Sequence, residues 1–152
     1  MKHIIDQACR LLGAIAVTLG GTLLTASAHA GEPLHLQAIM KEMGRAMQVI
    51  TDGIAREDWA LIAAAAPRIS AHDQPPQDEK IRIITFMGPG MGQFKAFDTE
   101  TGEAALSLEQ AARRADAQQV IDSFRQVQTG CMNCHQQFRS KIKAHFYGVA
   151  PR

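Results

Sequence analysis

The sequence DAQQVIDSFRQVQTGCMNCHQQFRSKI, residues 116–142, is the stretch that decides the fold. Its apolar residues, its two cysteines and one histidine recur every three or four positions, at Val120, Phe124, Val127, Cys131, Cys134/His135, Phe138 and Ile142. This spacing draws one stripe along an α-helix. Asp116 and Gln119 have the spacing of a capping box, which marks a helix start. The stretch therefore predicts a long C-terminal helix whose buried stripe carries the cysteine motif.

The motif in this helix is Cys-x-x-Cys-His, formed by Cys131, Cys134 and His135. Positions i, i+3 and i+4 of a helix share a face, so the two thiols and the imidazole point the same way. Two thiols at this spacing can bond to the two vinyl groups of one haem, and the imidazole then reaches the iron from the same side. We predict one covalent haem c, attached at Cys131 and Cys134, with His135 as an iron ligand.

Three other interpretations of the motif are weaker. A thioredoxin-type redox pair is expected in a βαβ unit, with its first cysteine at a helix N-terminus. A structural zinc site needs four ligands, and no second cysteine pair completes one. The third interpretation is a buried cysteine pair beside an unrelated histidine. A disulfide framework is excluded by number, because the chain has only three cysteines and one of them, Cys9, precedes the apolar run of the leader.

Residues 1–30 have the pattern of a Sec-type signal peptide. A short polar opening precedes an apolar run, and Ala28-His29-Ala30 has the small-x-small pattern read by signal peptidase. We predict cleavage after Ala30, export to the periplasm, and a single mature domain over residues 31–152 that does not span the membrane. Bacterial haem attachment takes place outside the cytoplasmic membrane, so the leader and the motif support each other. Removing residues 1–30 leaves 14 basic and 14 acidic residues, a balance that gives no reason to expect a nucleic-acid partner.

The remaining chain favours further helices. Residues 34–54 place Leu36, Ile39/Met40, Met43, Met47, Ile50 and Ile54 on one stripe. Asp52-Gly53 supplies a stop signal near its end. A second helix is expected over residues 57–66, and Pro67 should kink or end it.

The middle of the chain, residues 72–106, is not decided by its sequence. A loop from His72 and a helix of about two turns over 79–87 are expected, followed by a break at MGPGMG, residues 87–92. Residues 93–115 fit either one helix disturbed at Gly102 or a loop followed by a helix from Ser107, which has capping-box spacing with Gln110. The overall prediction is all-α, an antiparallel four-helix bundle with the haem on its C-terminal helix.

At this point the chain resembles a known family. A C-terminal Cys-x-x-Cys-His followed by phenylalanine and arginine, here CHQQFR at residues 134–139, in an exported chain of four amphipathic helices is similar to the cytochrome c′ family, the class II c-type cytochromes. The resemblance covers about residues 34–147 and is closest to the low-spin, methionine-ligated branch. That branch resembles LMKxxGRxM in the first helix, where this chain reads IMKEMGRAM, residues 39–47. The resemblance implies Met40 as the second iron ligand.

Several site assignments stay open at the level of sequence. Met43 and Met47 share the stripe of Met40, and a methionine at helical spacing is more often core filler than ligand, so no methionine need bind the iron. Phe124 and Phe138 are expected to pack against the porphyrin. Arg139 meets a haem propionate or faces water. Lys141 and Lys143 suit the negative end of the helix dipole, and a partner-docking patch is the less favoured interpretation.

The function predicted from these features is a periplasmic monohaem cytochrome that carries single electrons between redox proteins and is not an enzyme. Many members of the resembled family dimerise through the first two helices, so a homodimer is a further expectation from the resemblance. The first alternative is a high-spin, five-coordinate protein that binds nitric oxide or carbon monoxide. The second is a thiol-disulfide oxidoreductase without haem.

Overall fold

The computed structural model describes residues 34–148, which form helices joined by short connections. The elements in chain order are α1 (His35–Ala55), α2 (Trp59–Ala65), α3 (Pro67–Ser70), α4 (Gln77–Met87), a 3₁₀ turn (Gly88–Gly90), α5 (Met91–Arg113), α6 (Ala117–Cys134), a π-helical turn (His135–Arg139) and α7 (Ser140–Tyr147). None of these helices is long and apolar enough to cross a membrane. The predicted signal peptide, residues 1–30, lies outside the described residues.

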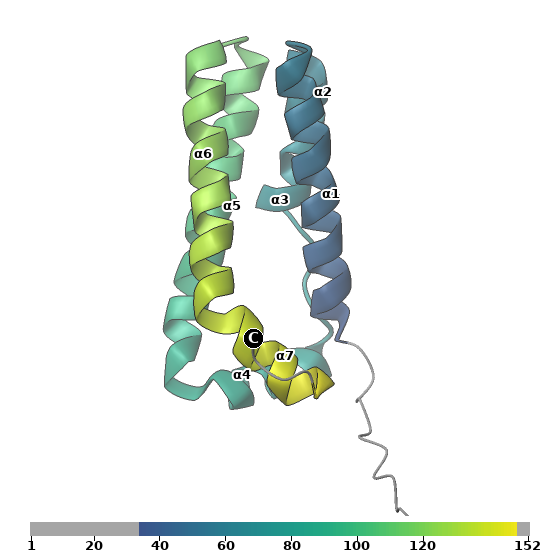
Figure 1. Cartoon of the computed structure of the whole chain (residues 1–152), viewed down its shortest axis with the longest axis vertical. Helices are drawn as coiled ribbons and strands as arrows, with labels where there is room; N and C mark the ends of the chain where they lie inside the picture. Colours follow the sequence, from purple (N-terminus) through teal and green to yellow (C-terminus); the bar gives the residue numbers. More distant parts are fainter. Residues whose placement is uncertain (1–33, 149–152) are drawn as a thin grey trace, which may run out of the picture.

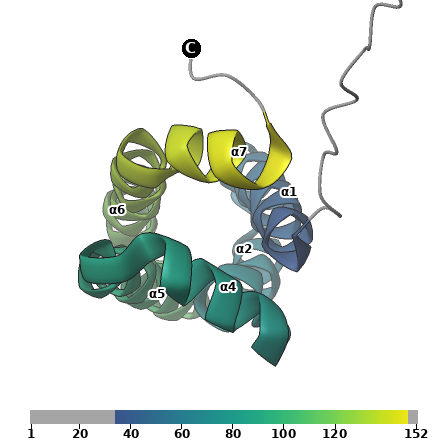
Figure 2. The same cartoon turned by 90° about the horizontal axis from the view of Figure 1, so that it is seen from below.

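The helices form a four-helix bundle, as predicted, and its long elements run alternately up and down (Figure 1). α5 packs along α6 and also contacts α2 and α3, while α1 packs against α2 and α3. α1 and α6 are not among the closely packed pairs of elements. At the lower end of Figure 1, α4, the π-helical turn and α7 gather beside the start of α1, and Figure 2 shows α7 lying between α6 and α1. This lower end is where the bundle opens to hold a site.

Side-chain caps fix the starts of two helices. The Asp116 carboxylate accepts the Gln119 N–H at 3.1 Å, which confirms the predicted start of the last helix. The Gln119 side chain donates to Ser123 instead of reaching back, so only half of the capping box forms. Asp58 caps α2 in the same way through the Leu61 N–H at 2.9 Å, and Glu57 has a φ of 54° in the preceding turn. The second helix therefore begins two residues later than predicted.

α1 ends at Ala55, one residue beyond the predicted end at Ile54 and close to the Asp52-Gly53 stop signal, although Gly53 itself still lies within the helix. Gly53 is buried against α2, and a Cβ on it would lie 2.7 Å from Cγ1 of Ile62. This glycine therefore permits a close approach of two helices. The Pro67 prediction is confirmed, since α2 ends at Ala65 and the proline opens α3.

The middle of the chain is more helical than its sequence indicates. α4 has 11 residues and begins at Gln77. The break after it is confirmed by Gly88, whose φ of 48° favours glycine, but Met91 and Gly92 already belong to α5. α5 is one uninterrupted helix of 23 residues. The alternative start at Ser107 is wrong, and Gly102 does not disturb the helix.

The buried apolar side chains form two clusters. The main core fills the bundle between α1, α2, α3, α5 and α6, around the fully buried Ile50, Ile62, Leu108, Val120 and Val127. The second core lies at the lower end and is formed by Leu34, Ile83, Met87, Phe138 and Phe146. Helices packed around two separate cores leave room between them for a cavity.

The start of α1 is capped by residues distant in sequence. The carboxylate of Glu79, which is 7% exposed, accepts the N–H groups of His35 at 2.5 Å and Leu36 at 2.7 Å. The hydroxyl of Tyr147 accepts the Leu34 N–H at 3.1 Å. The first turn of a helix has unpaired N–H donors and favours negative charge. α4 and α7 thus satisfy the donors of α1 and fix its position.

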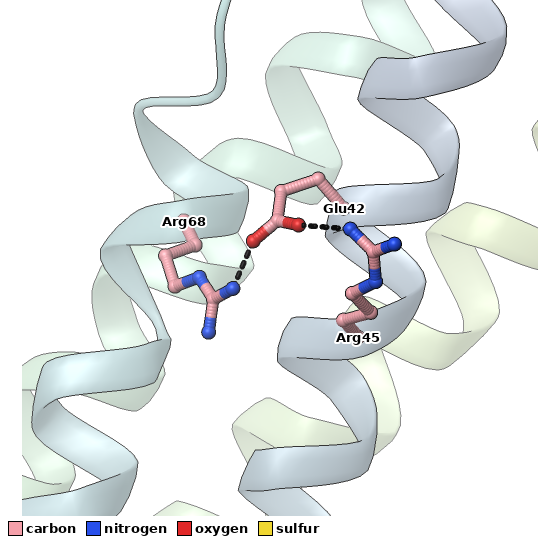
Figure 3. Close-up of polar contacts among 3 residues, drawn as sticks. All are labelled: Glu42, Arg45 and Arg68. Carbon is pink, nitrogen blue, oxygen red and sulfur yellow. Dashed lines mark hydrogen bonds and ion pairs between the residues drawn. The ribbon is translucent and has the colours of Figure 1, made fainter.

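α1 is also tied to α3 on the outside of the bundle. Glu42 forms an ion pair with Arg45 at 2.9 Å within α1 and another with Arg68 of α3 (Figure 3). The hydrogen bonds from Arg45 and then from Arg68 lower the pKa of the Glu42 carboxyl. All three side chains are solvent-exposed, so water screens their attraction.

Candidate functional site

A cavity of about 560 Å³ lies at the lower end of the bundle, where α1, α5, α6, the π-helical turn and α7 meet. It borders both cores, because Met43 and Cys131 pack on the main core while Leu36, Phe94 and Phe138 belong to or pack on the second. Cofactor pockets commonly have volumes of about 300–1,000 Å³ and mostly apolar walls. The cavity has the size and the lining of such a site.

Cys131, Cys134 and His135 all line this cavity. The N–H of His135 bonds to the carbonyls of Cys131 and Met132, so the motif keeps helical geometry to its last residue. The cysteines are half-buried and His135 is exposed. The stripe of the last helix is therefore core only as far as Val127, and from Cys131 onward it is a cavity wall.

A π-helical turn, His135–Arg139, begins directly at the histidine of the motif. π-Turns are rare and frequently occur at functional sites, since the added residue changes how side chains on either side are aimed. Phe138 is 5% exposed and contacts Phe94 edge to face, with ring centroids 5.5 Å apart. Arg139 is exposed and lines the cavity. The turn thus places one side chain in the second core while its neighbour faces the cavity.

The environment shifts the pKa values of the motif residues. Burial, then the Asp98 carboxylate, then Cys131 raise the pKa of Cys134 to about 11. Burial also raises the pKa of Cys131. Desolvation, assisted by the Arg139 guanidinium, lowers the pKa of His135. A neutral imidazole is the form that binds metals, whereas protonated thiols at a helix C-terminus lack the lowered pKa of a redox cysteine pair.

The methionines of α1 divide between the cavity and the core. Met40 and Met43 both line the cavity. Met40 is 37% exposed and packs in neither core, while Met43 packs against the main core. Met47 packs against the main core and is not a lining residue. α1 and α6 stand on different sides of the bundle in both views (Figures 1 and 2), and Met40 of α1 lines the same cavity as His135, the residue that follows α6.

The wall supplied by α5 was not predicted. Phe94, Phe97, Asp98 and Thr101 line the cavity at helical spacing. The helical spacing of these residues is present in the sequence, but the glycines on either side left the secondary structure of the segment undecided. Asp98 also binds His72, whose Nε2 lies 3.0 Å from its carboxylate. This pairing raises the pKa of His72, helped by the Asp73 carbonyl and opposed by burial.

α5 and α6 approach closely beside the motif because of Gly130. A Cβ on Gly130 would lie 2.4 Å from Oγ1 and 3.3 Å from Cβ of Thr101. Thr101 is 6% exposed, and its hydroxyl donates to the Phe97 carbonyl at 2.7 Å. The glycine thus sets the distance between the α5 wall and Cys131.

Phe124 lies outside the site. It packs against the main core and is not a lining residue of the cavity. Of the two phenylalanines expected to pack on a porphyrin, only Phe138 borders the cavity.

The residues of the cavity fit a covalently attached haem. Two thiols and an imidazole from the end of α6, two methionine thioethers from α1 and three phenylalanine rings line the cavity together. Lys41, Arg139 and Lys143 also line the cavity and could meet carboxylates of a cofactor. Among residues 34–148, no three His, Cys, Asp or Glu side chains gather as ligands for a bare metal ion.

A helical bundle with this cavity and motif is that of a c-type cytochrome. Comparison of the sequence with protein families matches residues 90–139 to the family described as cytochrome C′, so this segment is similar to that family. The searches of curated proteins and of solved structures gave no match. The family binds covalent c-type haem with iron, and its members transfer electrons or bind gases and are not enzymes.

Proposed function

We propose that this cytochrome is a periplasmic single-electron carrier whose low-spin haem iron is bound by His135 and Met40. Cys131 and Cys134 hold the haem covalently in this proposal, and Arg139 meets a propionate. Export would follow from cleavage of the predicted signal peptide after Ala30, and the partners would be other periplasmic redox proteins. The haem supplies an iron that alternates between two oxidation states without exchange of ligands.

The observation that carries the proposal is the position of Met40. The Met40 side chain is 37% exposed, lines the cavity and belongs to neither core. Packing alone therefore stabilises this unbranched apolar side chain little in its position. Met40 lines the same cavity as His135, and a low-spin haem iron would need a second axial ligand there. Met43 is the weaker candidate, because its side chain packs on the main core.

The other residues of the cavity would position the haem and exclude water. Phe94, Phe97 and Phe138 supply apolar walls, which keep the iron in a medium of low polarity. The lowered pKa of His135 keeps its imidazole neutral and able to bind iron at neutral pH. The raised pKa values of Cys131 and Cys134 argue against the thiol-disulfide oxidoreductase, whose attacking cysteine needs an accessible thiolate.

Absorption spectroscopy of Met40→Ala holoprotein tests the proposal, with Met43→Ala as the matched control on the next turn of α1. The wild-type protein should have sharp low-spin bands when reduced and a weak sulfur-to-iron band when oxidised. Met40→Ala should lose that band, become high-spin and bind carbon monoxide, while Met43→Ala keeps the wild-type spectrum. Carbon monoxide binding by the wild type with a high-spin spectrum would instead establish the gas-binding alternative.

Mass spectrometry of the mature protein tests the attachment separately. One haem mass should be bound covalently, and Cys131→Ala combined with Cys134→Ala should remove it. A mature mass equal to that of the polypeptide alone would favour the thiol-disulfide oxidoreductase.

A further inference from the structure

Several basic side chains around the cavity form no ion pair within residues 34–148. The surface that we call the cationic rim consists of Lys41, Lys80, Lys95, Arg139, Lys141 and Lys143. Three of its members line the cavity, and Lys80 and Lys95 line a groove that shares Leu36 and Met40 with it. No ion pair among residues 34–148 involves a member of the rim.

The carboxylates at the same end only partly balance the rim. Glu79 is buried and occupied by the N–H groups of α1, and Asp98 is paired with His72. Asp73 and Asp78 remain as exposed acidic side chains at this end. Because a hydrogen-bonded carboxylate keeps its charge, the six cations face four carboxylates, Asp73, Asp78, Glu79 and Asp98, and the remaining positive excess attracts anions over the range of the Debye length.

The rest of the bundle is organised in the opposite way. Five arginines in the middle and at the upper end each contact a carboxylate within 4 Å, two of them through Glu42 (Figure 3). The paired arginines are Arg45, Arg56, Arg68, Arg113 and Arg125. Unpaired cations are thus concentrated where the cavity lies.

Exposed apolar side chains lie inside the rim. Met40 and Ile84 line the groove between Lys80 and Lys95, and Ile84 is 50% exposed. An apolar centre with a polar border is the usual composition of a protein-protein interface. Haem carboxylates can pair with cavity-lining cations, but Lys80, Lys95 and Lys141 lie outside the cavity lining and stay free for a partner.

We propose that the cationic rim docks an acidic face of a redox partner protein over the mouth of the cavity, an inference that rests on the proposed electron transfer. An acidic protein is favoured over a membrane because two members of the rim, Lys80 and Lys95, line a groove together with the apolar Met40 and Ile84. Charge complementarity of this kind speeds encounter and orients the partner. The partner would thereby reach the haem edge in one orientation.

The test measures oxidation of the reduced holoprotein by two small reagents of opposite charge, hexacyanoferrate(III) and tris(phenanthroline)cobalt(III). The rate with the anion should fall with rising ionic strength, and the rate with the cation should rise. In Lys80→Glu and Lys95→Glu, the rate with the anion divided by the rate with the cation should fall at least roughly tenfold at about 0.01 M salt. This figure assumes about 10 Å between the substituted side chain and the reagent. At about 1 M salt the difference should nearly vanish. A ratio of rates removes the effect of any change in reduction potential.

The control is Arg114→Glu, which makes the same charge change at an exposed arginine that forms no ion pair within residues 34–148 and lies at the upper end. This variant should keep the wild-type ratio. Equal ratios in the control and the rim variants would overturn the docking proposal and leave the electron carrier intact. Failure of the wild-type protein to exchange electrons with either reagent would overturn both.

Two further probes identify the class of partner. A ten-residue poly-glutamate peptide should inhibit oxidation by hexacyanoferrate(III) in the wild type, and the inhibition should weaken in Lys80→Glu and Lys95→Glu. Phosphatidylglycerol vesicles should not bind the protein in a manner that depends on these lysines. Vesicle binding that the two variants abolish, without inhibition by the peptide, would assign the rim to a membrane surface and overturn the proposal.

Discussion

Replacing Gly130 with alanine should force α6 away from α5 beside the cysteine motif. The new Cβ would lie 2.4 Å from Oγ1 of Thr101, closer than such atoms can approach. Rotating the Thr101 side chain would move Oγ1 away but would leave its Cβ at 3.3 Å, which is still a tight contact. It would also break the hydrogen bond from the hydroxyl to the Phe97 carbonyl. The helices must therefore separate.

The size of the effect follows from two opposing terms. Overpacking a well-packed contact costs about 2 kcal/mol, within a usual range of roughly 1–3. Alanine in place of glycine in a helix interior contributes about 1 kcal/mol in the opposite direction. The expected net loss in the free energy of unfolding is about 1 kcal/mol. Gly44→Ala is the matched control in α1, because no atom lies within 4 Å of its Cβ and only the favourable term of about 1 kcal/mol applies.

Urea unfolding of the holoproteins, followed by far-ultraviolet circular dichroism, measures both variants. The free energies of unfolding of Gly130→Ala and Gly44→Ala should differ by about 2 kcal/mol. Adding Thr101→Ala to Gly130→Ala should recover part of the loss, since it removes the nearest atom. Equal stability of the two glycine variants would refute the close-approach argument.

Three other predictions concern single side chains. Glu79→Gln should cost about 1–3 kcal/mol in urea unfolding, because a buried carboxylate that accepts two N–H bonds is replaced by a neutral amide; unchanged stability would contradict the cap. Asp98 raises the pKa of His72, so the folded state binds more protons than the unfolded chain. The pair therefore stabilises the fold fully below about pH 6.5, the pKa of an unperturbed histidine. This stabilisation is lost as the pH rises through the raised pKa of the folded state. His72→Gln should therefore lose more stability in acid than in mild base, and an equal loss at both would count against the pair. Phe138→Ala should shift the haem absorption spectrum and cost about 3 kcal/mol, whereas Phe124→Ala should leave the spectrum unchanged; a spectral shift in both would return Phe124 to the haem site.

The start of the C-terminal helix and its motif could be predicted from sequence because both depend on local rules, but the prediction of a single helix as far as Ile142 is wrong, since α6 ends at Cys134 and a π-helical turn precedes α7. The three-four repeat from Val120 to Ile142 and the cap at Asp116 act within a few residues of one another. The same local rules were a poorer guide at Gly53, which lies within α1, and at Gly102, which does not disturb α5. A glycine breaks a helix only where nothing else holds it, and Gly53 is held by the contact of α1 with Ile62 of α2. Long-range packing therefore overrode the propensity of the single residue.

The candidate site was only partly predictable for a related reason. A helical stripe indicates which residues face inward, but it does not distinguish a packed core from a cavity wall. Phe124 and Cys131 share the stripe and both pack against the main core, yet only Cys131 also lines the cavity. The π-helical turn after Cys134 likewise has no marker in its sequence, HQQFR. Where the bundle opens is decided by α4 and α7, which lie far apart in the chain.

The cap on the first helix links the two ends of the described chain. Leu34 and Tyr147 are 113 residues apart, and Glu79 is more than 40 residues from the N–H groups it accepts. Contacts of such long range form late in folding, because each one closes a long loop. Because α1 also packs against α2 and α3, which follow it directly in sequence, we expect only its capped lower end to dock last. Met40 lies on the second turn of α1, so the residues around Tyr147 govern whether the proposed iron ligand is in place when the chain has finished folding.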